Sequence, residues 1–359
     1  MDEKITIIRT SKKKVKRKKK SHINKFTKLI YILSSLTIIV ISFLIINMIF
    51  RNKSNETAEI TIHSIFEEES KIQKNFCENE TLFYNENFEK KIKLTTASFQ
   101  NKKYKMFVYD QPDIVSYYIN KVGNYENTET LKIFEALNYY SKKKNLTFED
   151  MYILDIGANV GWYSFVFGKY GFKVISFEAS KINNYILHKN YCLNKEVNIT
   201  IINKGLYNED KKCDIYNTNW NVGNGMIFCD KNSTIPKYFN PNKTDEIILT
   251  KLSNYIPLLS DKNIVLIKID IEGSEGKVFQ GGIELITKYH VPLIFLEFSP
   301  NSLRMHDTDP KAFLQLFIDN GYKIGLSGFF DKTIYQIEDI IKKTKQFTTL
   351  YIFYSNILG

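Results

Sequence analysis

Ile153-Leu-Asp-Ile-Gly-Ala-Asn-Val-Gly161 is the stretch of this 359-residue sequence that decides the fold. A short apolar run ends there in a glycine-containing turn, and a second apolar run, Phe172-Lys-Val-Ile-Ser-Phe-Glu178, ends in an acid. This order is typical of the first strand, turn, helix and second strand of a doubly wound sheet that holds a nucleoside at its edge. We therefore predict an α/β fold with a ligand at the turn.

The polar residues of the two runs indicate which nucleoside binds. A dinucleotide fingerprint, Gly-x-Gly-x-x-Gly, brings a helix N-terminus to a pyrophosphate, whereas here Gly157 and Gly161 flank Asn159 and an acid, Asp155, precedes the turn. An acid would repel a pyrophosphate but would attract the cationic amino-acid end of S-adenosylmethionine, while Glu178 can accept hydrogen bonds from ribose hydroxyls. We predict S-adenosylmethionine as the cofactor, bound by these five residues. For Gly157 taken alone, a purely structural turn is the alternative.

Seven predicted strands, with helical segments between several of them, extend the pattern along the chain. They lie at residues 152–156, 173–177, 197–203, 264–269, 293–298, 323–326 and 348–354. The almost continuous apolar runs at 264–269 and 293–298 are typical of strands that are buried on both faces. We predict a Rossmann-like, doubly wound sheet of seven strands whose last two can pair antiparallel, which is the layout of class I methyltransferases.

Two further segments are predicted around this sheet. Residues 92–109 alternate like an antiparallel pair of strands, and residues 129–142 have a helical apolar stripe. Together they form an N-terminal extension of the domain. Residues 207–250 interrupt the strand and helix order, and we expect a hairpin there that faces the substrate.

A second polar motif, Leu266-Ile-Lys-Ile-Asp-Ile-Glu-Gly-Ser-Glu275, follows the fourth predicted strand. Asp270 is at the carboxyl end of that strand, where open α/β sheets bind ligands, so we add it to the cofactor-binding residues. Asp270 and Glu272 are also candidates for the base that removes a proton from an acceptor hydroxyl. His306, after the fifth strand, is a third catalytic candidate because its ordinary pKa is near neutral.

Each of these candidates has a structural alternative. Glu272 could cap the helix predicted at residues 274–280, and His306 could be an ordinary surface residue. Asp270, Glu272 and Glu275 could instead chelate Mg²⁺, but Glu275 should point away once the helix begins. We therefore predict no metal.

Together the motifs resemble the FkbM family of S-adenosylmethionine-dependent methyltransferases. The resemblance rests on Leu-Asp-Ile-Gly-Ala-Asn-Val-Gly-Trp-Tyr-Ser at Leu154, on Phe-Glu-Ala-Ser at Phe177, on the acidic motif at Asp270, and on Phe-Leu-Glu-Phe, and it extends from about Val115 to Phe298. It implies methylation of a hydroxyl or carboxyl oxygen, on a glycan or a small molecule. A catalytically inactive, membrane-anchored scaffold on a methyltransferase fold is the alternative.

The N-terminal 50 residues differ from the rest in charge and hydropathy. Residues 1–28 hold 12 of the 50 Lys and Arg against Asp2 and Glu3, and so carry +10 of the total net charge of +11. Leu29 to Phe50 is 22 residues without a charge, roughly 33 Å as a helix and enough to span a bilayer. We predict an uncleaved anchor rather than a signal peptide, because the apolar run is long and no small-residue cleavage site follows it.

This arrangement predicts a type II membrane protein. The basic tail stays in the cytosol and the remainder is lumenal, in the Golgi or endoplasmic reticulum. The division is a tail at 1–28, a membrane span at 29–50, a stem at 51–85 and a methyltransferase domain at 86–359. We expect no nucleic-acid partner, although a nuclear localisation signal is the competing interpretation of the basic run.

Sequons and cysteines give weaker support for a lumenal domain. Seven Asn-x-Ser/Thr sequons begin at Asn52, Asn55, Asn79, Asn145, Asn198, Asn232 and Asn242. The four cysteines, Cys77, Cys192, Cys213 and Cys229, lack metal-ligand spacing and allow three disulfide pairings or free thiols.

Overall fold

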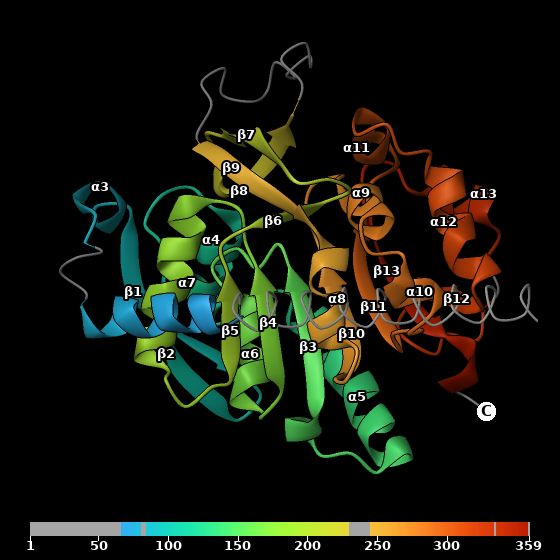
Figure 1. Ribbon diagram of the computed structural model, residues 1–359, viewed down its shortest axis with the longest axis horizontal. Coiled ribbons are helices and arrows are strands. Elements are labelled where there is room, and N and C mark those ends of the chain that lie inside the picture. Colours follow the sequence, from blue (N-terminus) through green and yellow to red (C-terminus); the bar gives the residue numbers. More distant parts are fainter. Residues whose placement is uncertain (1–65, 80–83, 230–244, 334, 358–359) are drawn as a thin grey trace, which may run out of the picture. The chain divides into compact units, whose positions relative to one another are not determined.

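A computed structural model describes residues 66–79, 84–229, 245–333 and 335–357 of the chain (Figure 1). These residues belong to one compact unit, Ile62–Gly359. In this described part of the chain, no helix is both long and apolar enough to cross a membrane. The predicted tail (1–28), the predicted span (29–50) and the first part of the predicted stem lie outside the described residues.

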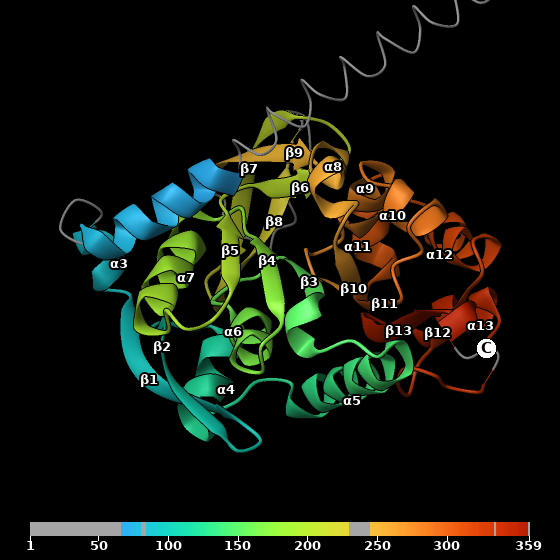
Figure 2. The same cartoon turned by 60° about the horizontal axis from the view of Figure 1, so that its bottom comes forward.

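A seven-stranded sheet organises the domain, and its strand order is β5-β4-β3-β10-β11-β13-β12, from left to right in Figure 2. In that order the strands are Ile199–Ile202, Lys173–Phe177, Met151–Ile156, Asn263–Ile269, Leu293–Phe298, Thr348–Tyr354 and Tyr322–Gly325. The pairs are parallel except those of β13, which runs antiparallel to β11 and β12. All seven predicted strands and the antiparallel pairing of the last two are therefore confirmed.

Helices cover both faces of this sheet because successive strand residues point to opposite sides. Ile153 faces a core shared with α5 (Asn127–Lys144), α6 (Trp162–Lys169) and α7 (Lys181–Leu193). Leu154 faces a second core shared with α8 (Ile256–Leu259), α9 (Glu275–Gln280), α10 (Glu284–Thr287), α11 (Pro300–Met305), α12 (Pro310–Asp319) and α13 (Ile337–Lys343). The fold is thus the predicted doubly wound α/β arrangement.

The N-terminal extension contains the predicted pair of strands, β1 (Ile92–Phe99) and β2 (Lys102–Tyr109), which are antiparallel. The short helix α3 (Glu86–Glu89) precedes them and α4 (Ile114–Val122) follows. Short 3-10 turns occur at Phe148–Asp150, Leu252–Asn254 and Ser355–Ile357.

A helix over residues 66–78, within the predicted stem, packs on the domain beside the edge strand β5. The Gln73 amide donates to the Ile199 carbonyl (2.8 Å) and accepts from the Ile201 backbone N–H (3.2 Å). Phe76 is buried, and a Cys77–Cys192 disulfide joins the helix to α7. The Gln73 side chain thus pairs with backbone groups that an edge strand would otherwise leave open.

The segment predicted as an insertion forms a separate four-stranded sheet with strand order β6-β9-β7-β8, in the upper part of Figure 1. Its strands are β6 (Gly205–Tyr207), β7 (Lys211–Thr218), β8 (Asn221–Phe228) and β9 (Asp245–Lys251). A second disulfide joins Cys213 of β7 to Cys229, which directly follows β8. All four cysteines are therefore paired, and the free-thiol alternative is wrong.

Candidate active site

A cavity lies at the carboxyl ends of β3, β4 and β10, and encloses about 900 Å³ including its open mouth. The sheet side contributes the turn after β3, the end of β4 and the acidic motif after β10. The opposite wall includes residues of β8, namely Gly223, Asn224, Gly225 and Ile227. The predicted substrate-facing hairpin is therefore part of the cavity wall.

The turn after β3 depends on its two glycines in different ways. Gly157 has φ +76°, and a Cβ atom there would clash with the Asp270 carbonyl oxygen. Gly161 has φ +94° and packs against Phe165 at the start of α6, away from the cavity. Of the two glycines, therefore, only Gly157 lines the cavity, followed by Ala158 and Asn159.

Glu178 lies at the end of β4 and is buried in the cavity wall. Its carboxylate accepts from the Asn159 and Ser180 backbone N–H groups, at 2.8 Å each. Burial raises the pKa of Glu178 in spite of these N–H donors. Each carboxylate oxygen has a further lone pair, so the group can still accept from ligand hydroxyls.

Asp155 lies beneath the turn rather than in the cavity lining. The side chain is 1% exposed, accepts from the Ser164 hydroxyl (2.5 Å), and lies 3.5 Å from the Lys268 ammonium. Lys268 does line the cavity and donates to the Gly157 carbonyl (2.9 Å). Asp155 therefore does not contact the cavity directly but helps to position Lys268, which holds the turn at Gly157.

Lys268 stays charged although it is buried. Burial favours the neutral amine, but the surrounding carboxylates of Asp155, Asp270, Glu126 and Glu178 outweigh burial and raise the pKa of Lys268. The ammonium thus balances part of the negative charge at this edge of the sheet.

Three carboxylates gather at the carboxyl ends of β10 and β11. Asp270, Glu272 and Glu297 each place one oxygen within 4.8 Å of the other two, and the Asn224 amide donates to Glu272. Burial and then Asp270 raise the pKa of Glu272 to about 7. Burial and the neighbouring acids raise the pKa of Glu297 to about 10.

Glu297 is a residue that the sequence analysis did not single out. The signal was available, because Glu297 is the one acid in the apolar run of β11. Carboxylate oxygens are ligands that Mg²⁺ accepts, so Asp270, Glu272 and Glu297 are the described residues that could hold a cation. The raised pKa values of Glu272 and Glu297 indicate that protonation of these carboxyls also reduces the repulsion.

Two alternatives from the sequence concerned Glu275 as a Mg²⁺ ligand and Glu272 as a helix cap, and the structure supports neither. Glu275 is buried, accepts from the backbone N–H groups of Ile271 (3.1 Å) and Gly273 (3.2 Å), and is not among the residues that line the cavity. It therefore points away from the cavity, as expected. Glu272 does not cap α9, because its carboxylate accepts from the Asn224 amide and its side chain lines the cavity.

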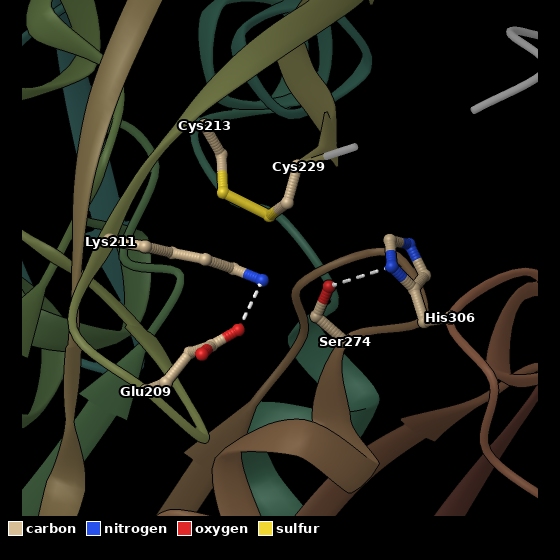
Figure 3. Close-up of a disulfide and its surroundings, with 6 residues drawn as sticks. All are labelled: Glu209, Lys211, Cys213, Cys229, Ser274 and His306. Carbon is tan, nitrogen blue, oxygen red and sulfur yellow. Dashed lines mark hydrogen bonds and ion pairs between the residues drawn. A yellow bond between two sulfur atoms is a disulfide. The ribbon is translucent and has the colours of Figure 1, made fainter. Parts of the chain in front are cut away.

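His306 is buried, so the surface interpretation is wrong. Figure 3 shows its ring directed toward Ser274, and the His306 Nδ1 to Ser274 Oγ distance is 3.5 Å. Burial, with the nearby Lys277 charge, lowers the pKa of His306 to about 4. Ser274 lines the cavity whereas His306 does not, so His306 lies one side chain behind the cavity wall.

A further wall comes from the segment before α5. Tyr125 lines the cavity, and Glu126 accepts from the Tyr163 hydroxyl at 2.5 Å. Burial raises the pKa of Glu126, and Asp270 adds to the increase. These residues were not predicted as site residues, because their partners are distant in the chain.

Residues 155–324 match the family described as the methyltransferase FkbM domain. These residues are an FkbM methyltransferase domain. The FkbM domain begins at Asp155 in β3 and ends in β12, so it contains the glycine turn, Glu178, the acidic motif and the insertion. The family suggested by the motifs is confirmed.

The chain also matches solved methyltransferase structures at low sequence identity, whereas no curated protein matches it in sequence. The bifunctional kinase-methyltransferase WbdD shares 11% identity at a TM-score of 0.41, over 68% of this chain and 44% of that chain. The RsmC 16S rRNA methyltransferase of T. thermophilus, in complex with AdoMet and guanosine, shares 12% identity at a TM-score of 0.35, over 74% of this chain and 51% of that chain. This chain thus spans less than half the length of WbdD.

Proposed function

We propose that the protein transfers the methyl group of S-adenosylmethionine to a hydroxyl oxygen of a glycan or glycoconjugate in the secretory pathway. The observation that carries this proposal is that two sets of polar residues line one cavity. The turn with Glu178 and the acidic motif with Asp270 and Glu272 line the same cavity, and Gly157 lies against the Asp270 carbonyl. A donor and an acceptor can therefore be held side by side there.

The chemistry of the cavity wall fits S-adenosylmethionine. Glu178 would accept from the ribose hydroxyls, and Asp270 would attract the ammonium of the amino-acid end. Apolar side chains suited to the adenine ring also line the cavity, among them Phe177, Leu206, Ile215 and Leu249. When bound, the cofactor supplies a methyl group on a positively charged sulfur.

The remaining task of the chain is to orient an acceptor hydroxyl and take its proton. Glu272 is suited to this task because its pKa of about 7 leaves it partly ionised at neutral pH. The Asn224 amide holds one Glu272 oxygen, and the protonated Glu297 reduces repulsion within the carboxylate cluster. Positioning the acceptor in this geometry contributes to the rate by itself.

Three features support a lumenal site. The predicted topology places the domain across the membrane from the basic tail. Both disulfides suit an oxidising compartment. The sequon residues Asn79, Asn145 and Asn198 are exposed. Sugars are the abundant hydroxyl compounds of that compartment, which is why a glycan is the proposed acceptor rather than a small molecule.

The test combines cofactor binding with analysis of the transferred methyl group. The full chain should bind S-adenosylmethionine in calorimetry, and Glu178→Ala should weaken binding at least tenfold, whereas the exposed Glu135→Ala control should not. Methyl label transferred to a hydroxyl resists mild alkali as an ether, whereas a carboxyl methyl ester is released as methanol. Absence of any heat of binding with the wild-type chain would refute the proposal, and alkali-labile label would replace the hydroxyl with a carboxyl acceptor.

A further inference from the structure

We propose that an exposed aromatic surface beside the cavity binds the sugar units next to the one that is methylated. This surface, called the aromatic ledge, consists of Ile114, Tyr117, Tyr118 and Val122 of α4 and Trp220 of the β7–β8 turn. The inference rests on the proposed glycan acceptor and adds where a longer acceptor would lie.

The ledge is an unusually apolar piece of surface. On α4, the exposed fractions are 41% for Ile114, 53% for Tyr117, 48% for Tyr118 and 55% for Val122. Their spacing of three and four residues puts these side chains on one face of the helix. The opposite face buries Ser116 and Ile119 in the domain, so α4 has a second apolar face with nothing packed on it in the described chain. Exposed apolar surface of this kind marks a binding site more often than a single exposed side chain does.

Backbone contacts connect the helix to the hairpin that carries Trp220, which is 59% exposed. The Asn221 side-chain oxygen accepts from the Ile114 N–H (3.1 Å), and the Val222 N–H donates to the Pro112 carbonyl (3.0 Å). Trp220 immediately precedes these residues in the chain. The two parts of the ledge therefore belong to one connected surface.

The same elements connect the ledge to the cavity. Val115 of α4 and Gly223 of β8 both line the cavity. Val115 follows Ile114 of the ledge, and Gly223 lies three residues after Trp220. The Gly223 N–H donates to the Asp113 carboxylate (3.2 Å), and a Cβ at this glycine would clash with that carboxylate. An acceptor whose reacting sugar enters the cavity would thus have its neighbouring units over α4 and the hairpin turn.

The chemistry of the ledge suits carbohydrate. The faces of aromatic rings carry partial negative charge and attract the partially positive C–H groups on one face of a pyranose ring. The Lys121 ammonium donates to the Tyr117 hydroxyl (2.7 Å), and the Tyr117 and Tyr118 rings pack edge to face with their centroids 5.4 Å apart. Side-chain amides that can bond sugar hydroxyls line the adjoining cavity, namely Asn159, Asn183 and Asn224.

Charge favours a neutral glycan over a membrane surface. Within α4, which is described throughout, Lys121 is the only charged residue. Recognition of an anionic bilayer uses several clustered lysines and arginines, which α4 lacks. The ledge therefore fits a neutral, hydroxyl-rich chain better than lipid headgroups.

The test uses the full chain, a saturating concentration of S-adenosylmethionine and two kinds of probe. The probes are methyl glycosides of neutral hexoses and linear oligosaccharides of two to four units of the same hexoses. Binding is followed by saturation-transfer NMR, and methyl transfer by label incorporation. We expect the Tyr117→Ala/Tyr118→Ala variant and Trp220→Ala each to raise KM for oligosaccharides about tenfold, with KM for the single glycosides and Kd for the cofactor changed less than twofold.

Two controls separate this role from a general loss of structure. Tyr139→Ala removes an aromatic side chain of α5 that is 41% exposed and remote from the ledge, and should change nothing. Tyr117→Phe/Tyr118→Phe keeps both rings and should bind oligosaccharides like the wild type. Thermal unfolding of every variant checks that the fold is intact.

The outcomes distinguish this inference from the proposed function. Oligosaccharide binding that depends on the ledge, without methyl transfer, would support the ledge and refute the proposed reaction. The proposed role of the ledge would be overturned if the ledge variants raised KM equally for single glycosides and oligosaccharides. It would also be overturned if the wild type bound no oligosaccharide. Variants that weaken co-sedimentation with phosphatidylcholine and phosphatidylserine vesicles while oligosaccharide binding is unchanged would overturn it as well.

Discussion

In the proposed reaction, the ionisation of the single residue Glu272 decides whether the acceptor proton can be removed. Burial and the Asp270 carboxylate raise its pKa to about 7. Because a base must be ionised to act, kcat should rise with pH through about 7 and then level off. Glu272→Gln should lower kcat by about 10²- to 10⁴-fold, and calorimetry should find cofactor affinity within about threefold of wild type. A flat pH profile from pH 5.5 to 8.5 would contradict this role.

Glu297 gives a second prediction, on stability. Burial, then Asp270 and Glu272, raise its pKa to about 10 in the folded protein, against about 4.3 in an unfolded chain. The stabilisation from this protonated group is complete below the unfolded pKa and is lost as pH rises toward the folded pKa. Glu297→Gln has a neutral side chain of the same shape, so its Tm should exceed that of wild type by an amount that grows from pH 5 to pH 8.5.

Thermal unfolding of the Glu297→Gln variant across this pH range makes the measurement, with Glu135→Gln on the exposed face of α5 as the control. The control Tm should follow wild type at every pH. A Tm difference for Glu297→Gln that does not change with pH would show that Glu297 is ionised in the folded state.

The positions of Glu297 and Asp155 show what could be predicted about the site. The acids at strand ends were predicted correctly to share one edge, because parallel strands end together. Which of them line the cavity depends on side-chain direction. Asp155 lies in register with Ser176 of β4 and Lys268 of β10, which forms a polar row within the sheet and keeps the carboxylate below the turn. Such a row spans three strands and is not visible in local spacing.

At the scale of elements, the disulfides should contribute unequally to stability. Cys77–Cys192 joins residues 115 apart in the chain, whereas Cys213–Cys229 joins residues 16 apart. Closing the longer loop removes more entropy from the unfolded chain, a difference of roughly 2 kcal/mol. Cys77→Ser/Cys192→Ser should therefore lower the free energy of unfolding by more than Cys213→Ser/Cys229→Ser does. Guanidinium unfolding of both variants measures this, and the reverse order would contradict it.

The two sheets and the helix over residues 66–78 differ in how far the sequence predicts them. The strands of the large sheet were predictable because each is a short, mainly apolar segment, and β10 and β11 are almost continuously apolar. The second sheet was not fully predictable, since β6 pairs with β9 across a long sequence separation, Gly205 opposite Leu249. The docking of residues 66–78 was also hidden, because Gln73 bonds the edge of β5 and nothing in the neighbouring sequence indicates that partner.

At the scale of the whole molecule, the proposed orientation across the membrane makes a prediction about modification. Three sequon residues of the described chain, Asn79, Asn145 and Asn198, are exposed. A glycan added in the lumen would therefore meet no packed side chains at these positions. Even Asn198, whose carbonyl accepts from Val174 in the sheet, has its side chain free for modification.

We expect the full chain, translated into microsomes, to gain glycans that peptide N-glycosidase removes. Replacing each of Asn79, Asn145 and Asn198 by Gln should reduce the glycosidase-sensitive mass by one step. Asn120→Gln, an exposed asparagine outside any sequon, should leave the mass unchanged. If no variant changes the mass, and protease added outside the microsomes digests the domain, the catalytic cavity faces the cytosol. In that case cytosolic S-adenosylmethionine reaches it directly and a lumenal glycan cannot be the acceptor.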